Sequence, residues 1–115
     1  MADRMTGYVY FASSQDADCT KIGFSINPEQ RIAWLQRRAP VTIKLICKVP
    51  GTRAQEKALH RRFARVRRWG EWFRSSGTIS TLIYLVEQSG KIPDDIETRH
   101  LPNSICQLKR VSGHV

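Results

Sequence analysis

The chain has 115 residues, which is enough for one domain with a modest core and too few for two. It is 41% hydrophobic and 9% aromatic, as in ordinary globular proteins, and no apolar run approaches the ~20 residues of a membrane helix. The formal charge of +9 and the pI near 10.1 predict attraction to a polyanion. We therefore expect no membrane role, and a nucleic acid as partner: DNA first, with RNA as the alternative.

Cysteine usage and the first residues predict the compartment. Cys19, Cys47 and Cys106 are odd in number and widely spaced, which argues against a disulfide framework or a zinc site. Residues 1–6 lack the apolar stretch of a signal peptide. We expect a cytoplasmic protein that is a monomer or a weak homodimer.

Residues 8–24 are predicted to form a β-hairpin, because two β-prone runs flank polar turn residues. Alternation places Val9 on one face of the first strand and Tyr10 on the other. Lys21 and Gly23 fall on the same face as Tyr10. If the apolar residues face the core, Tyr10 and Lys21 face outward. Gly23 then leaves space for a sugar-phosphate backbone.

A helix is predicted to begin at Asn27, a good N-cap, with Pro28 in its first position, and to run to about Arg38. Arg31 lies in its first turn, close to the end of the second strand. Residues 41–49 alternate between apolar and polar side chains and give the clearest strand pattern in the chain.

Two further helices are predicted from their capping residues, which are Thr52 with Gln55 for the first, and Ser76 or Thr78 with a terminal Gly90 for the second. Residues 70–73 between them read as a short irregular segment. The expected fold is therefore α/β (α+β), in the order strand, strand, helix, strand, helix, helix. We expect a domain over residues 1–90 and a partly ordered tail over 91–115.

Residues 53–74 carry most of the positive charge. They contain eight basic residues and two acids, and so supply six of the nine excess charges. The same segment contains Trp69, Trp72 and Phe73. Basic side chains interleaved with aromatics suit phosphate contact and base stacking. For the three aromatics, we favour packing at the core over stacking.

These motifs together resemble the GIY-YIG nuclease superfamily. Val9-Tyr10 stands at the end of the first motif, and Lys21-Ile22-Gly23 stands where the family has Tyr-Ile-Gly. Arg31 follows Lys21 by ten residues, as in the family, and Glu56 stands where the family places its metal-binding glutamate. The Lys-Ile-Gly and Gly-Glu-Trp-Phe variants look like a phage-type branch.

The resemblance covers roughly residues 7–86 and implies a three-stranded antiparallel sheet flanked by three helices. It also implies an endonuclease that hydrolyses DNA phosphodiester bonds with Mg²⁺, for which Mn²⁺ can substitute. Such hydrolysis needs an activated water, stabilised phosphoryl oxygens and help for the leaving oxygen.

The resemblance assigns Mg²⁺ to Glu56, the scissile phosphate to Arg31 and the general base to Tyr10. A phenol with a pKa near ~10 is a poor base at neutral pH. Lys21 opposite Tyr10 would favour the phenolate, or would instead bind phosphate. His60, one turn after Glu56, is either an active-site residue or a packing residue.

The residues expected to contact nucleic acid are Tyr8, Lys21, Arg31, Arg61, Arg62 and Arg65. Two departures from the family bear on activity. Leu35 stands where many members have His or Tyr, and no asparagine lies between Glu56 and Gly90. The alternative function is therefore a catalytically weak or inactive nucleic-acid-binding module on the same fold.

Overall fold

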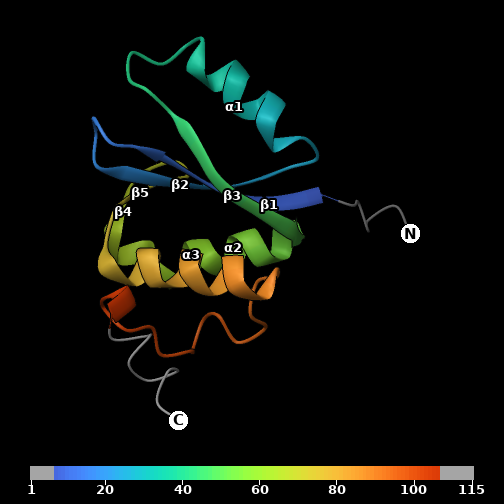
Figure 1. Ribbon diagram of the computed structural model, residues 1–115, viewed down its shortest axis with the longest axis vertical. Helices are drawn as coiled ribbons and strands as arrows, with labels where there is room; N and C mark the ends of the chain where they lie inside the picture. Colours follow the sequence, from blue (N-terminus) through green and yellow to red (C-terminus); the bar gives the residue numbers. More distant parts are fainter. Residues whose placement is uncertain (1–6, 107–115) are drawn as a thin grey trace.

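The computed structural model describes residues 7–106. The elements in chain order are β1 (Gly7–Ser14), β2 (Cys19–Ser25), α1 (Pro28–Gln36), β3 (Lys44–Gly51), α2 (Arg53–Arg62), a 3-10 turn η1 (Ala64–Val66), β4 (Arg67–Trp69), β5 (Trp72–Arg74) and α3 (Gly77–Ser89). The strands form one antiparallel sheet in the order β3-β1-β2-β5-β4. Helix α1 lies on one face of this sheet, and α2 and α3 lie on the other (Figure 1).

The expected α+β class is confirmed, but the sheet has five strands instead of three. The two additional strands come from residues 67–74, part of which read as irregular. Gly70, with φ of +52°, and Glu71 make a tight turn between β4 and β5. Strand β5 then pairs with β2 and extends the sheet beyond the predicted hairpin.

The β1–β2 hairpin is confirmed, and its alternation separates two cores. Val9, Phe11 and Ile22 belong to the main core, which α2 and α3 cover. Tyr10 belongs to a smaller core with Ile32 of α1 and two other buried residues.

The expectation that Tyr10 and Lys21 face outward is wrong. Their side of the sheet is covered by α1, so Tyr10 is 1% exposed and Lys21 is 5% exposed. Gly23 does not leave open space either, because the Tyr10 ring lies over it. A Cβ at Gly23 would come within 2.5 Å of the ring carbon Cζ.

The predicted helix starts are confirmed by their caps. The Asn27 side chain accepts a hydrogen bond from the Gln30 backbone N–H at 3.1 Å, and Thr52 and Gln55 form the expected capping box. The Ser76 side chain caps α3, and Gly90 ends that helix in the left-handed conformation. Boundaries differ by a few residues: α1 ends at Gln36, and β3 begins at Lys44.

Residues that follow α3 pack against the domain. Ile92, Ile96 and Leu101 are buried in the main core. The Thr81 hydroxyl lies 2.9 Å from the Pro102 carbonyl oxygen, and a Cβ at Gly77 would collide with the backbone of Asn103. The division into a domain 1–90 and a tail 91–115 stays a prediction, and residues 107–115 of that tail lie outside the described chain. Within residues 7–106, no helix has the length and apolarity needed to cross a bilayer.

Candidate phosphodiester-binding cleft

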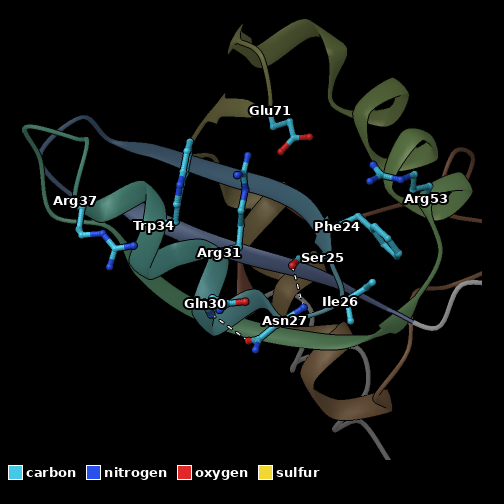
Figure 2. A pocket seen from close by; sticks show the side chains of 10 residues that line it. All are labelled: Phe24, Ser25, Ile26, Asn27, Gln30, Arg31, Trp34, Arg37, Arg53 and Glu71. Atoms are coloured by element: carbon cyan, nitrogen blue, oxygen red, sulfur yellow. Dashed lines mark hydrogen bonds between the residues drawn. The ribbon is translucent and has the colours of Figure 1, made fainter.

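A cleft of about 630 Å³ opens where the end of β2, the start of α1, the start of α2 and the β4–β5 turn meet. Arg31 and Trp34 line it from α1, Arg53 lines it from α2, and Glu71 lines it from the turn. Figure 2 shows the Arg31 and Trp34 side chains lying next to each other and pointing across the cleft. The Glu71 carboxylate points in from the opposite side. The cleft therefore combines cationic and acidic groups on one concave surface.

Arg31 is exposed and lines the cleft. Its guanidinium carbon lies 4.9 Å from the centre of the Trp34 ring, and Arg38 lies 3.9 Å from the same ring. These cation–π contacts hold the arginine side chains along α1. Arg31 forms no ion pair with any acid in the described chain, so its charge is available to a phosphate.

Tyr10 lies beneath this surface, and its hydroxyl is a very weak acid. Burial raises the pKa of Tyr10 to about 12, and the negative charge of Glu71 adds to the shift. Arg31 opposes the shift through its charge and a hydrogen bond. The cation that favours the phenolate of Tyr10 is therefore Arg31, and not Lys21 as expected.

Lys21 forms an ion pair with Glu71 instead, at 2.7 Å between Nζ and Oε1. Burial alone would raise the pKa of Glu71, but the hydrogen bond and charge of Lys21 outweigh it and hold the pKa below its usual range. The Glu71 backbone carbonyl also accepts a hydrogen bond from the Ile22 N–H at 3.0 Å. Both contacts fix the turn against β2 and hold the Glu71 carboxylate ionised at the cleft.

Glu56 on α2 is the predicted metal ligand, and it is 4% exposed. Its Oε2 atom is buried and has no hydrogen-bond partner in the described part of the chain. Burial, followed by a hydrogen bond and the charge of Glu71, raises the pKa of Glu56 to about 7. The pKa values of the two carboxyl groups are thus shifted in opposite directions, upward for Glu56 and downward for Glu71.

His60 lies one turn from Glu56 and packs against the sheet. Its Nε2 atom lies 2.9 Å from the Ile22 carbonyl oxygen and 3.8 Å from Glu56 Oε2. The ring also packs against Phe73 at 5.1 Å between centroids. His60 therefore contacts the core and the acidic group at once, and both of its expected roles have a geometric basis.

The donors fit a hard divalent cation. A buried carboxylate oxygen without a partner is costly, and a cation would satisfy it. Mg²⁺ is commonly held by one or two carboxylates together with water. Residues 7–106 contain no cluster of three or more His, Cys, Asp and Glu side chains suited to a metal. Glu56 and Glu71 could supply two carboxylates to such an ion.

The other residues predicted to contact nucleic acid are scattered. Tyr8 is half-buried with the Lys48 ammonium 4.6 Å from its ring. Arg61 pairs with Glu97 through two hydrogen bonds, of 3.1 and 2.7 Å, and Arg62 donates to the Arg99 carbonyl oxygen. Arg65 is exposed and forms no ion pair with a described acid. Of these four, Arg65 keeps its charge most available.

Glu71 lines the cleft and is the candidate site residue that sequence reasoning missed. It stands in the stretch read as irregular, between the triplets 67–69 and 72–74. A glycine-containing pair flanked by tryptophans is only a weak hairpin signal, because three residues are too few for alternation to indicate a strand.

Comparison with protein families identifies a domain that covers most of the chain. The model of the T5orf172 domain matches residues 7–95, from β1 to the segment that follows α3. No curated protein and no solved structure matches the chain significantly. The matched range includes every residue of the cleft described above. The chain belongs to the T5orf172 domain family.

Proposed function

We propose that the protein is a metal-dependent endonuclease of the GIY-YIG type that hydrolyses phosphodiester bonds, with DNA as its first substrate and RNA as the alternative. One observation carries the proposal. Within residues 7–106, a guanidinium that forms no ion pair, a tyrosine hydroxyl and a buried carboxyl group with an unpartnered oxygen belong to one electrostatically coupled group. Strongly perturbed ionisable groups beside a cleft are typical of catalytic sites.

Arg31 binds the scissile phosphate in this proposal. A planar guanidinium donates two parallel hydrogen bonds to phosphoryl oxygens and stabilises the charge that develops there. Arg53, on the α2 side of the cleft, adds positive charge for the neighbouring phosphates. The Trp34 ring limits the positions of the Arg31 side chain, which reduces the entropy lost on binding.

Glu56 and Glu71 would hold Mg²⁺, and Lys21 keeps the Glu71 carboxylate in place. When bound, the cation would supply a Lewis acid and would cancel the Glu71 and Glu56 charges, which add to burial in raising the pKa of Tyr10. With a pKa of about 12, only about one Tyr10 hydroxyl in 10⁵ is ionised at pH 7. Burial is the largest cause of this raised pKa and the Glu71 and Glu56 charges add to it, whereas the charge and hydrogen bond of Arg31 oppose it and favour the phenolate that a general base needs.

A plasmid-nicking assay with Mg²⁺ tests the proposal. We expect Glu56→Gln and Arg31→Ala each to reduce the cleavage rate at least ~100-fold, because each removes charge that stabilises the transition state. Tyr10→Phe, which removes only the hydroxyl, should reduce the rate without loss of fold. Lys44→Gln removes a cation from the opposite edge of the sheet and serves as the control with little effect. Cleavage that persists at the same rate in both Glu56→Gln and Arg31→Ala would show that a contaminant is responsible.

A second function, nucleic-acid binding without efficient cleavage, is favoured by the Tyr10 environment. The hydroxyl is buried and its pKa of about 12 leaves almost no base at neutral pH. Binding that weakens steeply with salt, together with no Mg²⁺-dependent nicking, would support this alternative.

A further inference from the structure

We propose that the nucleic acid bound at the cleft is single-stranded, and that its unpaired bases stack on an aromatic row that leads from the cleft to the β4 edge of the sheet. The row consists of Trp72 and Trp69, next to Lys21. The inference rests on the proposed function, since it names the form of the substrate of that same site.

The pairing of the strands places these side chains side by side. Lys21 is opposite Trp72 across β2 and β5, and Trp72 is opposite Trp69 across β5 and β4. Residues directly opposite in an antiparallel pair share a face of the sheet. The Lys21 Nζ atom lies 5.6 Å from the centre of the Trp72 ring, which agrees with this placement. Phe73, one residue on, points instead into the main core on the other face.

The row begins at the cleft, because the β4–β5 turn supplies residues to both. Glu71 in the turn lines the cleft, and its neighbour Trp72 packs partly against the small core beneath α1. Trp69, on the other side of the turn, is 56% exposed and packs against neither core. The expectation that Trp69 packs at the core is therefore wrong. Its indole is a large apolar surface presented to solvent.

Unpaired cations accompany the row. Arg68 and Arg74 are exposed, and neither forms an ion pair within residues 7–106. Arg67 donates to the Gly70 carbonyl oxygen and also lacks an acidic partner there. Arg61 on α2, in contrast, is neutralised by Glu97. The β4–β5 hairpin thus keeps cationic groups available for phosphates beside an exposed aromatic ring.

An aromatic ring distinguishes a single strand from a duplex. In a duplex the base faces are stacked on one another, so a protein surface meets phosphates, sugars and groove edges. In a single strand the base faces are free, and stacking on an aromatic ring contributes about 1–3 kcal/mol per base for every base type. Positive charge alone would be enough to bind a duplex, whereas the Trp69 ring stabilises only complexes in which unpaired bases can stack on it.

The experiment measures binding apart from cleavage. Glu56→Gln protein in EDTA is titrated into fluorescent 12-nucleotide strands of oligo-dT, oligo-rU and a DNA duplex of the same length. We expect the single strands to bind more tightly than the duplex at equal salt. Trp69→Ala should weaken single-strand binding roughly 5- to 150-fold and change duplex binding less than 2-fold. Trp69→Phe should keep most of the affinity, and the arms with oligo-dT and oligo-rU compare a DNA strand with an RNA strand.

Ile46→Ala is the matched control, because it removes an exposed apolar side chain from β3 at the opposite edge of the sheet. It should leave every affinity unchanged. The inference is overturned if Trp69→Ala leaves single-strand binding intact or weakens duplex binding equally. If none of the three probes binds, the proposed function itself fails. That result differs from binding to the duplex that is unchanged in Trp69→Ala, which overturns only the inference about the single strand.

Discussion

Glu56 is the residue whose environment is hardest to explain by folding alone. A carboxyl group that is 4% exposed, with one oxygen lacking a partner, costs stability unless it is protonated or binds a cation. Burial and Glu71 raise its pKa to about 7, so the folded protein retains a proton that the unfolded chain has released. Ionisation of Glu56 therefore lowers the stability of the folded protein, and a divalent cation bound to its carboxylate would offset this loss.

This cost predicts that the protein becomes less stable as the pH rises. The folded-state pKa of Glu56 is raised, so its contribution to stability is complete below its usual pKa of 4.5 and is lost as the pH rises through about 7. In EDTA, we expect the free energy of unfolding to fall by about 2–3 kcal/mol between pH 5 and pH 8 because of this group. Glu56→Gln, which mimics the protonated acid, should remove that decline in denaturant titrations.

Glu97→Gln provides the control for the pH measurement. Glu97 is exposed, and Arg61 holds its pKa below its usual range, so its effect on stability lies at lower pH. The profile of this variant between pH 5 and pH 8 should follow that of the wild type. Parallel profiles for the wild type and Glu56→Gln would contradict the raised pKa of Glu56.

At the scale of elements, the short β4–β5 hairpin determines both the edge of the sheet and one side of the cleft. Its two strands have three residues each, yet they extend the sheet, place Glu71 at the cleft and expose Trp69. The tight turn depends on Gly70, whose φ of +52° is one that side chains with a Cβ rarely adopt.

Substitution at Gly70 tests this turn. Nothing lies within 4 Å of a Cβ built at this position, so Gly70→Ala should cost only the conformational penalty of about 1 kcal/mol. Gly70→Asn should cost less, because asparagine tolerates the left-handed region. Urea unfolding of the two variants measures the difference. Equal costs for alanine and asparagine would show that the backbone conformation is not what limits this turn.

The sequence predicted those elements that carry long or strong local signals. Asn27 and Ser76 each cap a helix through one side-chain hydrogen bond, and Thr52 forms a capping box with Gln55; these local signals can be found in the sequence without knowledge of the fold. The β4–β5 hairpin was missed because triplets are too short for periodicity to distinguish them from loop.

The environment of the site was harder to predict than its residues. Tyr10, Arg31 and Glu56 do lie in one coupled group, but alternation cannot tell which face of the sheet a helix will cover. The burial of Tyr10 and the Lys21–Glu71 pair depend on α1 and on the missed turn, which are tertiary features.

At the scale of the whole molecule, the sheet separates two cores of unequal size. The main core lies under α2 and α3 and includes side chains from residues 92–101. The smaller core lies under α1 and contains Tyr10, Ala12, Ile32 and Ile43. Most of the buried apolar surface therefore supports the side of the sheet that carries Glu56.

The contribution of the segment after α3 can be measured at Ile96, which is 2% exposed. Ile96→Ala should reduce the free energy of unfolding by about 2–5 kcal/mol, because it leaves a cavity in the main core. Ile26→Ala, at a position that is 62% exposed, should change stability by less than ~0.5 kcal/mol. If the two variants are equally stable, the segment beyond residue 90 is dispensable and the predicted domain boundary holds.

The placement of Arg31 and Glu56 over different cores has a consequence for how such a protein can diverge. Arg31 is on α1, which packs on the smaller core, whereas Glu56 is on α2, which packs on the main core. Substitutions that repack the smaller core would shift the Arg31 guanidinium and leave the Glu56 carboxylate in place. Related chains could in this way differ in the position of the guanidinium relative to the carboxylate without any substitution on α2.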